Sequence, residues 1–158
     1  MSNNFQKMAN ELQASIMEDA RKVYSEEVIE RWLNPRNLGK VRNPDGFAKI
    51  KGPCGDTMQI SFKVNDGRLA KLKFTTDGCA SSIAAGSMAT ELAQGKKIED
   101  AAEISQQMIL QALKGLPEES VHCALLASNT LKEAIRNYFD SKNNDSVKQR
   151  DKDIHTRG

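Results

Sequence analysis

Five side chains of the 158-residue sequence carry donor atoms that suit metal ions and sulfur chemistry, and each lies at a turn or a helix start. They are three thiols, one carboxylate and one imidazole: Cys54, Asp56, Cys79, His122 and Cys123. Soft thiolates with one harder oxygen or nitrogen donor suit tetrahedral zinc or an iron–sulfur cluster. The alternative is that all three cysteines are inert buried side chains, which their glycine-bordered or helix-initiating positions disfavour.

Local sequence indicates how these donors are presented. Cys54 and Asp56 lie in the turn-forming segment 52–56, and side chains two apart in an extended segment point the same way, so we expect them to face one spot. Cys79 precedes a helix of small residues, and Cys123 begins the last helix. Because the positive end of a helix favours a thiolate, we expect both of these thiols to be reactive.

A cysteine hydrolase is a third possibility for the same residues. Its base would be His122, directly before Cys123, and neighbouring side chains do not face each other well enough for that role. No pair has the Cys-x-x-Cys spacing of a zinc finger or redox motif. Separation is a weak objection to a shared site, because loops of 24 and 43 residues differ in closure entropy by only about 0.5 kcal/mol.

The elements that must position these donors follow from hydrophobic periodicity. Three strands are expected at 47–51, 58–64 and 69–74, with a turn at 65–68 between the last two. Helices are expected at 5–23, from 26 to before Pro35, at 80–94, as one or two short helices within 98–113, and at 121–138. The order predicts an α+β fold, a three-stranded antiparallel sheet with helices packed on one face, plus an N-terminal amphipathic helix.

Three regions are expected along the chain. Residues 1–24 form an N-terminal helical extension, 25–140 the domain with all five donors, and 141–158 a flexible polar tail. We expect the apolar stripe of the extension to pack on its own domain, with a partner or dimer surface as the alternative.

Charge and hydropathy exclude several classes of function. Residues 25–140 carry 15 basic and 15 acidic groups, so the body lacks the clustered positive charge that nucleic acids need. No run approaches 18 apolar residues, so no membrane helix is expected. The first residues lack an export signal and include Glu11, Glu18 and Asp19, unlike an organellar presequence. We therefore expect a cytoplasmic protein with reduced cysteines.

Four sequence motifs occur together and in one order. On these motifs the sequence resembles the IscU/NifU-type scaffold proteins for iron–sulfur cluster assembly, in their stand-alone form. The motifs are Tyr24-Ser25-Glu26-Glu27-Val28-Ile29 leading to Asn34-Pro35-Arg36-Asn37, then Cys54-Gly55-Asp56, then Gly78-Cys79-Ala80-Ser81-Ser82-Ile83-Ala84, and last His122-Cys123-Ala124-Leu125-Leu126-Ala127.

The resemblance implies roles for the five donors. Cys54, Cys79 and Cys123 match the three cluster ligands of the family, with Asp56 and His122 as alternative fourth ligands. By motif match Cys123 is the persulfide acceptor. The implied function is that of a scaffold, not an enzyme: a [2Fe-2S] cluster is assembled from iron and desulfurase-derived sulfur and passed on. The alternative is a zinc-binding protein that uses the same ligands as a structural site or to regulate the desulfurase.

The resemblance also implies partners. These are a cysteine desulfurase, a ferredoxin-type electron donor and apo iron–sulfur proteins, with a homo-oligomer as a further possibility. Many family members carry Leu-Pro-Pro-Val-Lys before the His-Cys pair, which a dedicated Hsp70-type chaperone grips. Here the segment at 116–120 reads Leu-Pro-Glu-Glu-Ser, with two added negative charges and no lysine, so we expect weak or no use of that chaperone.

Overall fold

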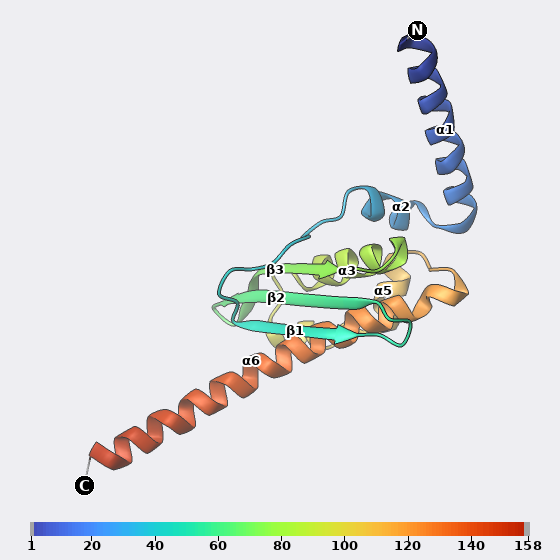
Figure 1. The fold of residues 1–158 in the computed structure, drawn as a ribbon. Helices are drawn as coiled ribbons and strands as arrows, with labels where there is room; N and C mark the ends of the chain where they lie inside the picture. Colours follow the sequence, from blue (N-terminus) through green and yellow to red (C-terminus); the bar gives the residue numbers. More distant parts are fainter. Residues whose placement is uncertain (1, 157–158) are drawn as a thin grey trace.

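A three-stranded antiparallel sheet lies at the centre of the fold (Figure 1). The structure is a computed structural model that describes the backbone of residues 2–156 and the side chains of residues 3–145. The strands β1 (Gly46–Lys51), β2 (Thr57–Asn65) and β3 (Arg68–Thr76) pair in sequence order. All three predicted strands are confirmed, and each is longer by one or two residues at one or both ends.

The turn between β2 and β3 is the two-residue hairpin that the sequence predicts. Asn65 pairs with Arg68, and the central residues Asp66 and Gly67 have φ values of 58° and 75°. Positive φ at both positions gives a turn whose twist matches that of the two strands. This hairpin carries the chain back along the sheet, so β3 ends beside the start of β2.

Helices cover one face of the sheet, as the sequence predicts (Figure 1). Alternate residues of β2 form that face, and Met58, Ile60 and Phe62 are fully buried. The helices of this layer are α3 (Ala80–Ala93), α4 (Ile98–Ala101), α5 (Gln106–Ala112) and α6 (Val121–Thr156), with a short 3-10 turn at Glu118–Ser120 before α6. Small residues bring α3 close to the sheet, because a side chain at Gly86 would collide with the ring of Phe74.

The second helix, α2 (Glu26–Leu33), begins and ends where the sequence predicts. The Ser25 side chain accepts a hydrogen bond from the backbone N–H of Val28 and caps the helix. The same hydroxyl donates to the carbonyl of Leu113, just after α5. The helix stops before Pro35, as expected from the restriction that proline places on the residue before it.

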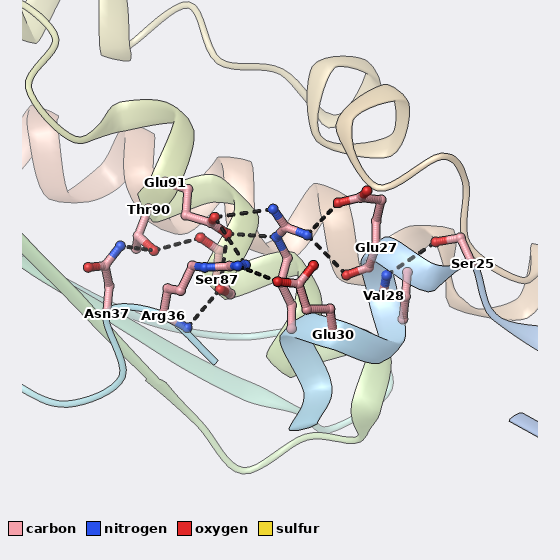
Figure 2. A network of polar contacts seen from close by, with 10 residues as sticks. Ser25, Glu27, Val28, Glu30, Arg36, Asn37, Ser87, Thr90 and Glu91 are labelled. Carbon is pink, nitrogen blue, oxygen red and sulfur yellow. Dashed lines mark hydrogen bonds and ion pairs between the residues drawn. The ribbon is translucent and has the colours of Figure 1, made fainter. Parts of the chain in front are cut away.

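Ion pairs join α2 and the segment after it to α3 (Figure 2). Arg31 Nε lies 2.7 Å from an oxygen of Glu91, and its Nη1 lies 2.6 Å from an oxygen of Glu27. Arg36 pairs with both Glu30 and Glu91. Burial lowers the pKa of Arg31, but its hydrogen bonds to Glu91 and Glu27 outweigh that effect and raise it. We call these five residues the arginine network.

The N-terminal helix, α1 (Ser2–Val23), forms but does not pack on the domain as expected. It projects away from the sheet (Figure 1), and its apolar stripe is open to solvent. Phe5 is 76% exposed, and Met8, Leu12 and Ile16 are more than half exposed. The expectation that this stripe packs on its own domain is therefore wrong, since none of these four side chains belongs to the core.

The last helix continues past the predicted end at Tyr138. It runs without a break to Thr156, because the sequence from Phe139 to that residue contains neither glycine nor proline. Of its predicted inward positions, Leu131, Ala134, Ile135 and Tyr138 are buried, whereas Leu125 is 43% exposed. Part of the predicted tail, 141–158, lies outside the described residues, and its flexibility stays a prediction. Among the helices that the structure describes, none is long and apolar enough to cross a membrane.

Candidate metal centre

Three segments far apart in the sequence meet at one end of the sheet. They are the turn between β1 and β2, the junction of β3 with α3, and the first turn of α6. A Cβ atom at Gly52 in the turn would lie 3.3 Å from the side chain of Leu126 in α6. The end of β3 is tied to the start of β2, because the backbone N–H of Thr57 donates to Asp77 and the Thr76 hydroxyl donates to the Thr57 carbonyl.

This meeting point brings together three of the five predicted donors. One ligand atom each from Asp56, Cys79 and Cys123 lies within 4.8 Å of the other two. Two thiols and a carboxylate at that separation suit a soft or borderline transition metal. In the part of the chain with described side chains, no lysine or arginine forms an ion pair with Asp56. We call Asp56, Cys79 and Cys123 the three-donor cluster.

Cys54 is exposed and lies outside the three-donor cluster. Its segment is a closed turn, in which the N–H of Gly52 donates to the Asp56 carbonyl and the N–H of Gly55 donates to the Gly52 carbonyl. Gly55 has a φ of 91°, a conformation that glycine adopts without strain. The segment is therefore a turn and not the extended chain that the sequence analysis assumed, and the shared orientation of Cys54 and Asp56 stays a prediction.

His122 also lies outside the three-donor cluster but contacts one of its members. Its Nε2 atom is 3.7 Å from the sulfur of Cys123. The sequence argument that these neighbours do not face each other is wrong. The imidazole at the start of α6 reaches the sulfur of the residue that follows it. Sequence spacing alone does not reveal this contact.

Comparison with known proteins identifies the family. A family model described as "NifU-like N terminal domain" matches residues 23–145. The chain belongs to this family of iron–sulfur cluster assembly scaffolds. The Archaeoglobus fulgidus "Iron-sulfur cluster assembly scaffold protein IscU 1" is 47% identical over 118 residues, which are 74% of this chain and 77% of that protein. The Azotobacter vinelandii "Iron-sulfur cluster assembly scaffold protein IscU" is 41% identical over 124 residues, 75% of this chain and 96% of that protein.

Solved structures share the fold of this IscU/NifU-type chain. A NifU-like N-terminal protein from Brucella abortus matches with a TM-score of 0.60 at 20% identity, over 75% of this chain and 95% of that one. A putative iron–sulfur cluster assembly scaffold of the SUF system from Fervidobacterium islandicum matches with a TM-score of 0.58 at 24% identity, over 71% of this chain and 96% of that one. At these identities the likeness establishes the fold only.

The two cysteines of the three-donor cluster differ in exposure. Cys79 is exposed at the N-terminal cap of α3, where the sequence places it. Cys123 is only 1% exposed, and this burial raises its pKa. A hydrogen bond from Ser82 partly lowers the pKa, while Cys79 and Asp56 raise it further. Burial therefore opposes the effect that the sequence analysis assigned to the helix start at Cys123.

Two further residues shape the site, and the sequence analysis gave neither of them a role. The Ser82 hydroxyl lies 2.8 Å from Oδ2 of Asp56 and 3.3 Å from the sulfur of Cys123. Gly78 makes room for this contact, since a Cβ atom there would lie 2.5 Å from the Ser82 oxygen and 2.6 Å from Oδ2 of Asp56. A sequence signal for Ser82 exists, because side chains in the first turn of a helix lean toward its N-terminus, where Cys79 lies.

Proposed function

We propose that this IscU/NifU-type chain is a scaffold on which a [2Fe-2S] cluster is assembled and then transferred to apo-proteins, with residues 25–140 as the working domain. The observation that carries the proposal is the convergence of Asp56, Cys79 and Cys123 on one point within 4.8 Å. Cys54, on the neighbouring turn, and His122, in contact with Cys123, supply the remaining donors. Family membership agrees with this function.

The donor set suits a cluster that must leave again. Three thiolates, from Cys54, Cys79 and Cys123, are one fewer than the four that hold most iron–sulfur clusters. An oxygen ligand from Asp56 or a nitrogen ligand from His122 binds iron less tightly than a fourth thiolate would. The incomplete thiolate set therefore favours release to a recipient protein.

Sulfur delivery requires a cysteine persulfide on a desulfurase and an acceptor thiolate here. We propose Cys123 as that acceptor: its thiol gives up its proton, its sulfur attacks the terminal sulfur of the persulfide, a new S–S bond forms, and the desulfurase cysteine leaves as a thiolate that takes up a proton. Because Cys123 is 1% exposed, we propose that the first turn of α6 opens before a persulfide reaches its sulfur. This opening makes sulfur transfer depend on contact with the desulfurase.

The remaining partners follow from the same chemistry. Persulfide sulfur must gain two electrons to become the sulfide of a cluster, so a ferredoxin-type electron donor is required. Apo iron–sulfur proteins are the recipients, and a homo-oligomer is compatible with the scaffold role. The three free cysteines suit a reducing compartment, so we place the protein in the cytoplasm.

Use of a Leu-Pro-Pro-Val-Lys-specific Hsp70-type chaperone is not part of the proposed function. In the segment 116–120, Glu118 and Glu119 start a short 3-10 turn next to α6, and no lysine follows. A peptide of these residues should bind such a chaperone at least about tenfold more weakly than a Leu-Pro-Pro-Val-Lys peptide, measured by fluorescence anisotropy. Equal affinity would contradict this expectation.

Anaerobic reconstitution tests the scaffold function. The chain is incubated with ferrous iron, cysteine and a cysteine desulfurase, and visible absorption is followed together with iron, acid-labile sulfide and zinc content. We expect charge-transfer bands and equal amounts of iron and sulfide, and loss of both in Cys54→Ala, Cys79→Ala and Cys123→Ala. A colourless protein that retains one tightly bound zinc through this treatment would instead support the zinc-binding alternative.

A further inference from the structure

The Ser82 side chain links two members of the three-donor cluster from a fully buried position. Its exposed fraction is 0%, and its oxygen lies between Oδ2 of Asp56 and the sulfur of Cys123, at 2.8 Å and 3.3 Å. A hydroxyl has one proton, so it donates to only one of these two acceptors at a time. The shorter contact is to the carboxylate, and hydrogen bonds to a carboxylate are about twice as strong as those between neutral groups.

This bond leaves half of the carboxylate available. A carboxylate has two acceptor oxygens, and Ser82 occupies Oδ2 of Asp56. Within residues 3–145 no hydrogen bond is directed to the other oxygen, Oδ1. Asp56 is thus anchored through one oxygen while a cation can bind the other.

The backbone around Ser82 is shaped for this contact. A Cβ atom at Gly78 would lie 2.5 Å from the Ser82 oxygen and 2.6 Å from Oδ2 of Asp56. Contacts that close essentially never occur for a real side chain, so any residue other than glycine would separate the two groups. The N–H of Gly78 in turn donates to the Thr76 hydroxyl, which fixes the backbone at this point.

We propose that Ser82 is a positioning residue for the assembly site: its hydroxyl holds the Asp56 carboxylate in the three-donor cluster so that Oδ1 is directed at the incoming metal ion. The proposal rests on the proposed function, since it requires Asp56 to be a ligand. Groups that hydrogen-bond to a metal ligand typically change metal affinity 10- to 100-fold when they are removed.

The neighbouring serine provides a matched control. Ser81 lies on the same first turn of α3 and is also 0% exposed, but its hydroxyl has no hydrogen-bond partner among the described residues. Ser81→Ala removes a hydroxyl that is equally buried, and it leaves the hydrogen bond between Ser82 and Asp56 in place. Ser82→Thr retains the hydroxyl and tests whether the effect of Ser82→Ala comes from the hydrogen bond.

Cobalt(II) alone, added anaerobically to the reduced full-length chain, is the probe. Thiolate-to-cobalt charge-transfer bands report the sulfur ligands, and visible d–d bands report the number and geometry of all ligands.

Ser82→Ala should weaken cobalt binding about 10- to 100-fold. It should also alter the d–d bands while charge-transfer intensity per bound cobalt stays constant. Ser81→Ala should bind like the unaltered chain, and Ser82→Thr should recover most of the affinity. Thermal melting checks that each variant is folded.

A double-mutant cycle with Asp56→Ala identifies the group through which Ser82 acts. In the Asp56→Ala background, Ser82→Ala should cause less than about a twofold further loss, because its partner is already gone. An undiminished loss there, unchanged affinity in Ser82→Ala, or an equal loss in Ser81→Ala would overturn the positioning role alone. Failure of the unaltered chain to show thiolate-to-cobalt bands would overturn the assembly site and the positioning role together.

Discussion

The two ends of α3 carry polar clusters of opposite design. Toward its C-terminus, Glu91 belongs to the arginine network, in which three carboxylates are paired with two guanidinium groups (Figure 2). At its N-terminus, Cys79 and Ser82 contribute to a site with two thiols and the Asp56 carboxylate. The first cluster is balanced by its own cations, whereas the second gathers electron-pair donors without one in the described part of the chain.

This difference separates structural from functional polar groups in one helix. A buried charge that contributes to stability is paired with an opposite charge of the same chain, because an unpaired buried charge is costly in free energy. Donors gathered without a cation can instead bind one that comes from outside the chain. The comparison therefore predicts that substitutions at the two ends will affect different measurable properties.

The largest expected effect is loss of the cluster in Cys79→Ala. Removing an exposed thiol should abolish the charge-transfer bands after reconstitution and leave the free energy of unfolding within about 0.5 kcal/mol of the unaltered chain. Visible absorption and urea unfolding measure the two quantities in one preparation. Normal cluster yield in this variant would remove Cys79 from the proposed ligands.

The opposite pattern is expected at the other end of α3. Arg31→Ala should lower the free energy of unfolding by about 1.5–3 kcal/mol, since Glu27 loses its cation and Glu91 retains only Arg36. Urea unfolding measures the loss. The folded fraction should still bind cobalt with the affinity of the unaltered chain.

An exposed ion pair gives the control for this substitution. Arg21 and Glu26 pair at 3.2 Å with side chains that are 57% and 74% exposed. Arg21→Ala should therefore cost less than about 1 kcal/mol. A similarly small loss in Arg31→Ala would show that the arginine network adds nothing beyond an ordinary surface pair.

A smaller effect concerns alkaline pH and Cys123. Because burial raises its pKa, the folded chain keeps the thiol proton at pH values where the unfolded chain has already lost it. The free energy of unfolding should therefore fall as pH rises through the usual cysteine range, by at most about 1.4 kcal/mol per pH unit. Urea unfolding at several pH values in reductant measures this slope. Cys123→Ala should lose this contribution, and an identical slope in both chains would contradict it.

A further effect of modest size is expected at the start of α2. Ser25→Ala removes the helix cap and the bond to the Leu113 carbonyl, and should cost about 0.5–2 kcal/mol of unfolding free energy. Ser25→Thr retains a capping hydroxyl and should cost less. Differential scanning calorimetry is suitable for comparing these variants. Equal losses in the two would indicate that packing, not capping, accounts for the effect.

Most of the fold could be predicted because its signals are local. Alternation of apolar residues located the three strands, the Asp66-Gly67 pair located the hairpin, and Ser25 marked the start of α2. The predictions were wrong where the packing or the length of a helix depends on the residues around it. Within residues 3–145 no surface of the domain covers the stripe of α1, and no glycine or proline follows Tyr138 in α6 to stop the helix.

The sequence by itself determined the types of donor, their order and the family to which they belong. Only the tertiary structure decided that Asp56, Cys79 and Cys123 meet while Cys54 lies apart, and that Ser82 anchors the carboxylate. The physical reason is range: a helix or strand depends on neighbours a few residues away, whereas the contacts of Ser82 span 26 and 41 residues. Burial of Cys123, and with it the raised pKa, exists only after those segments pack together.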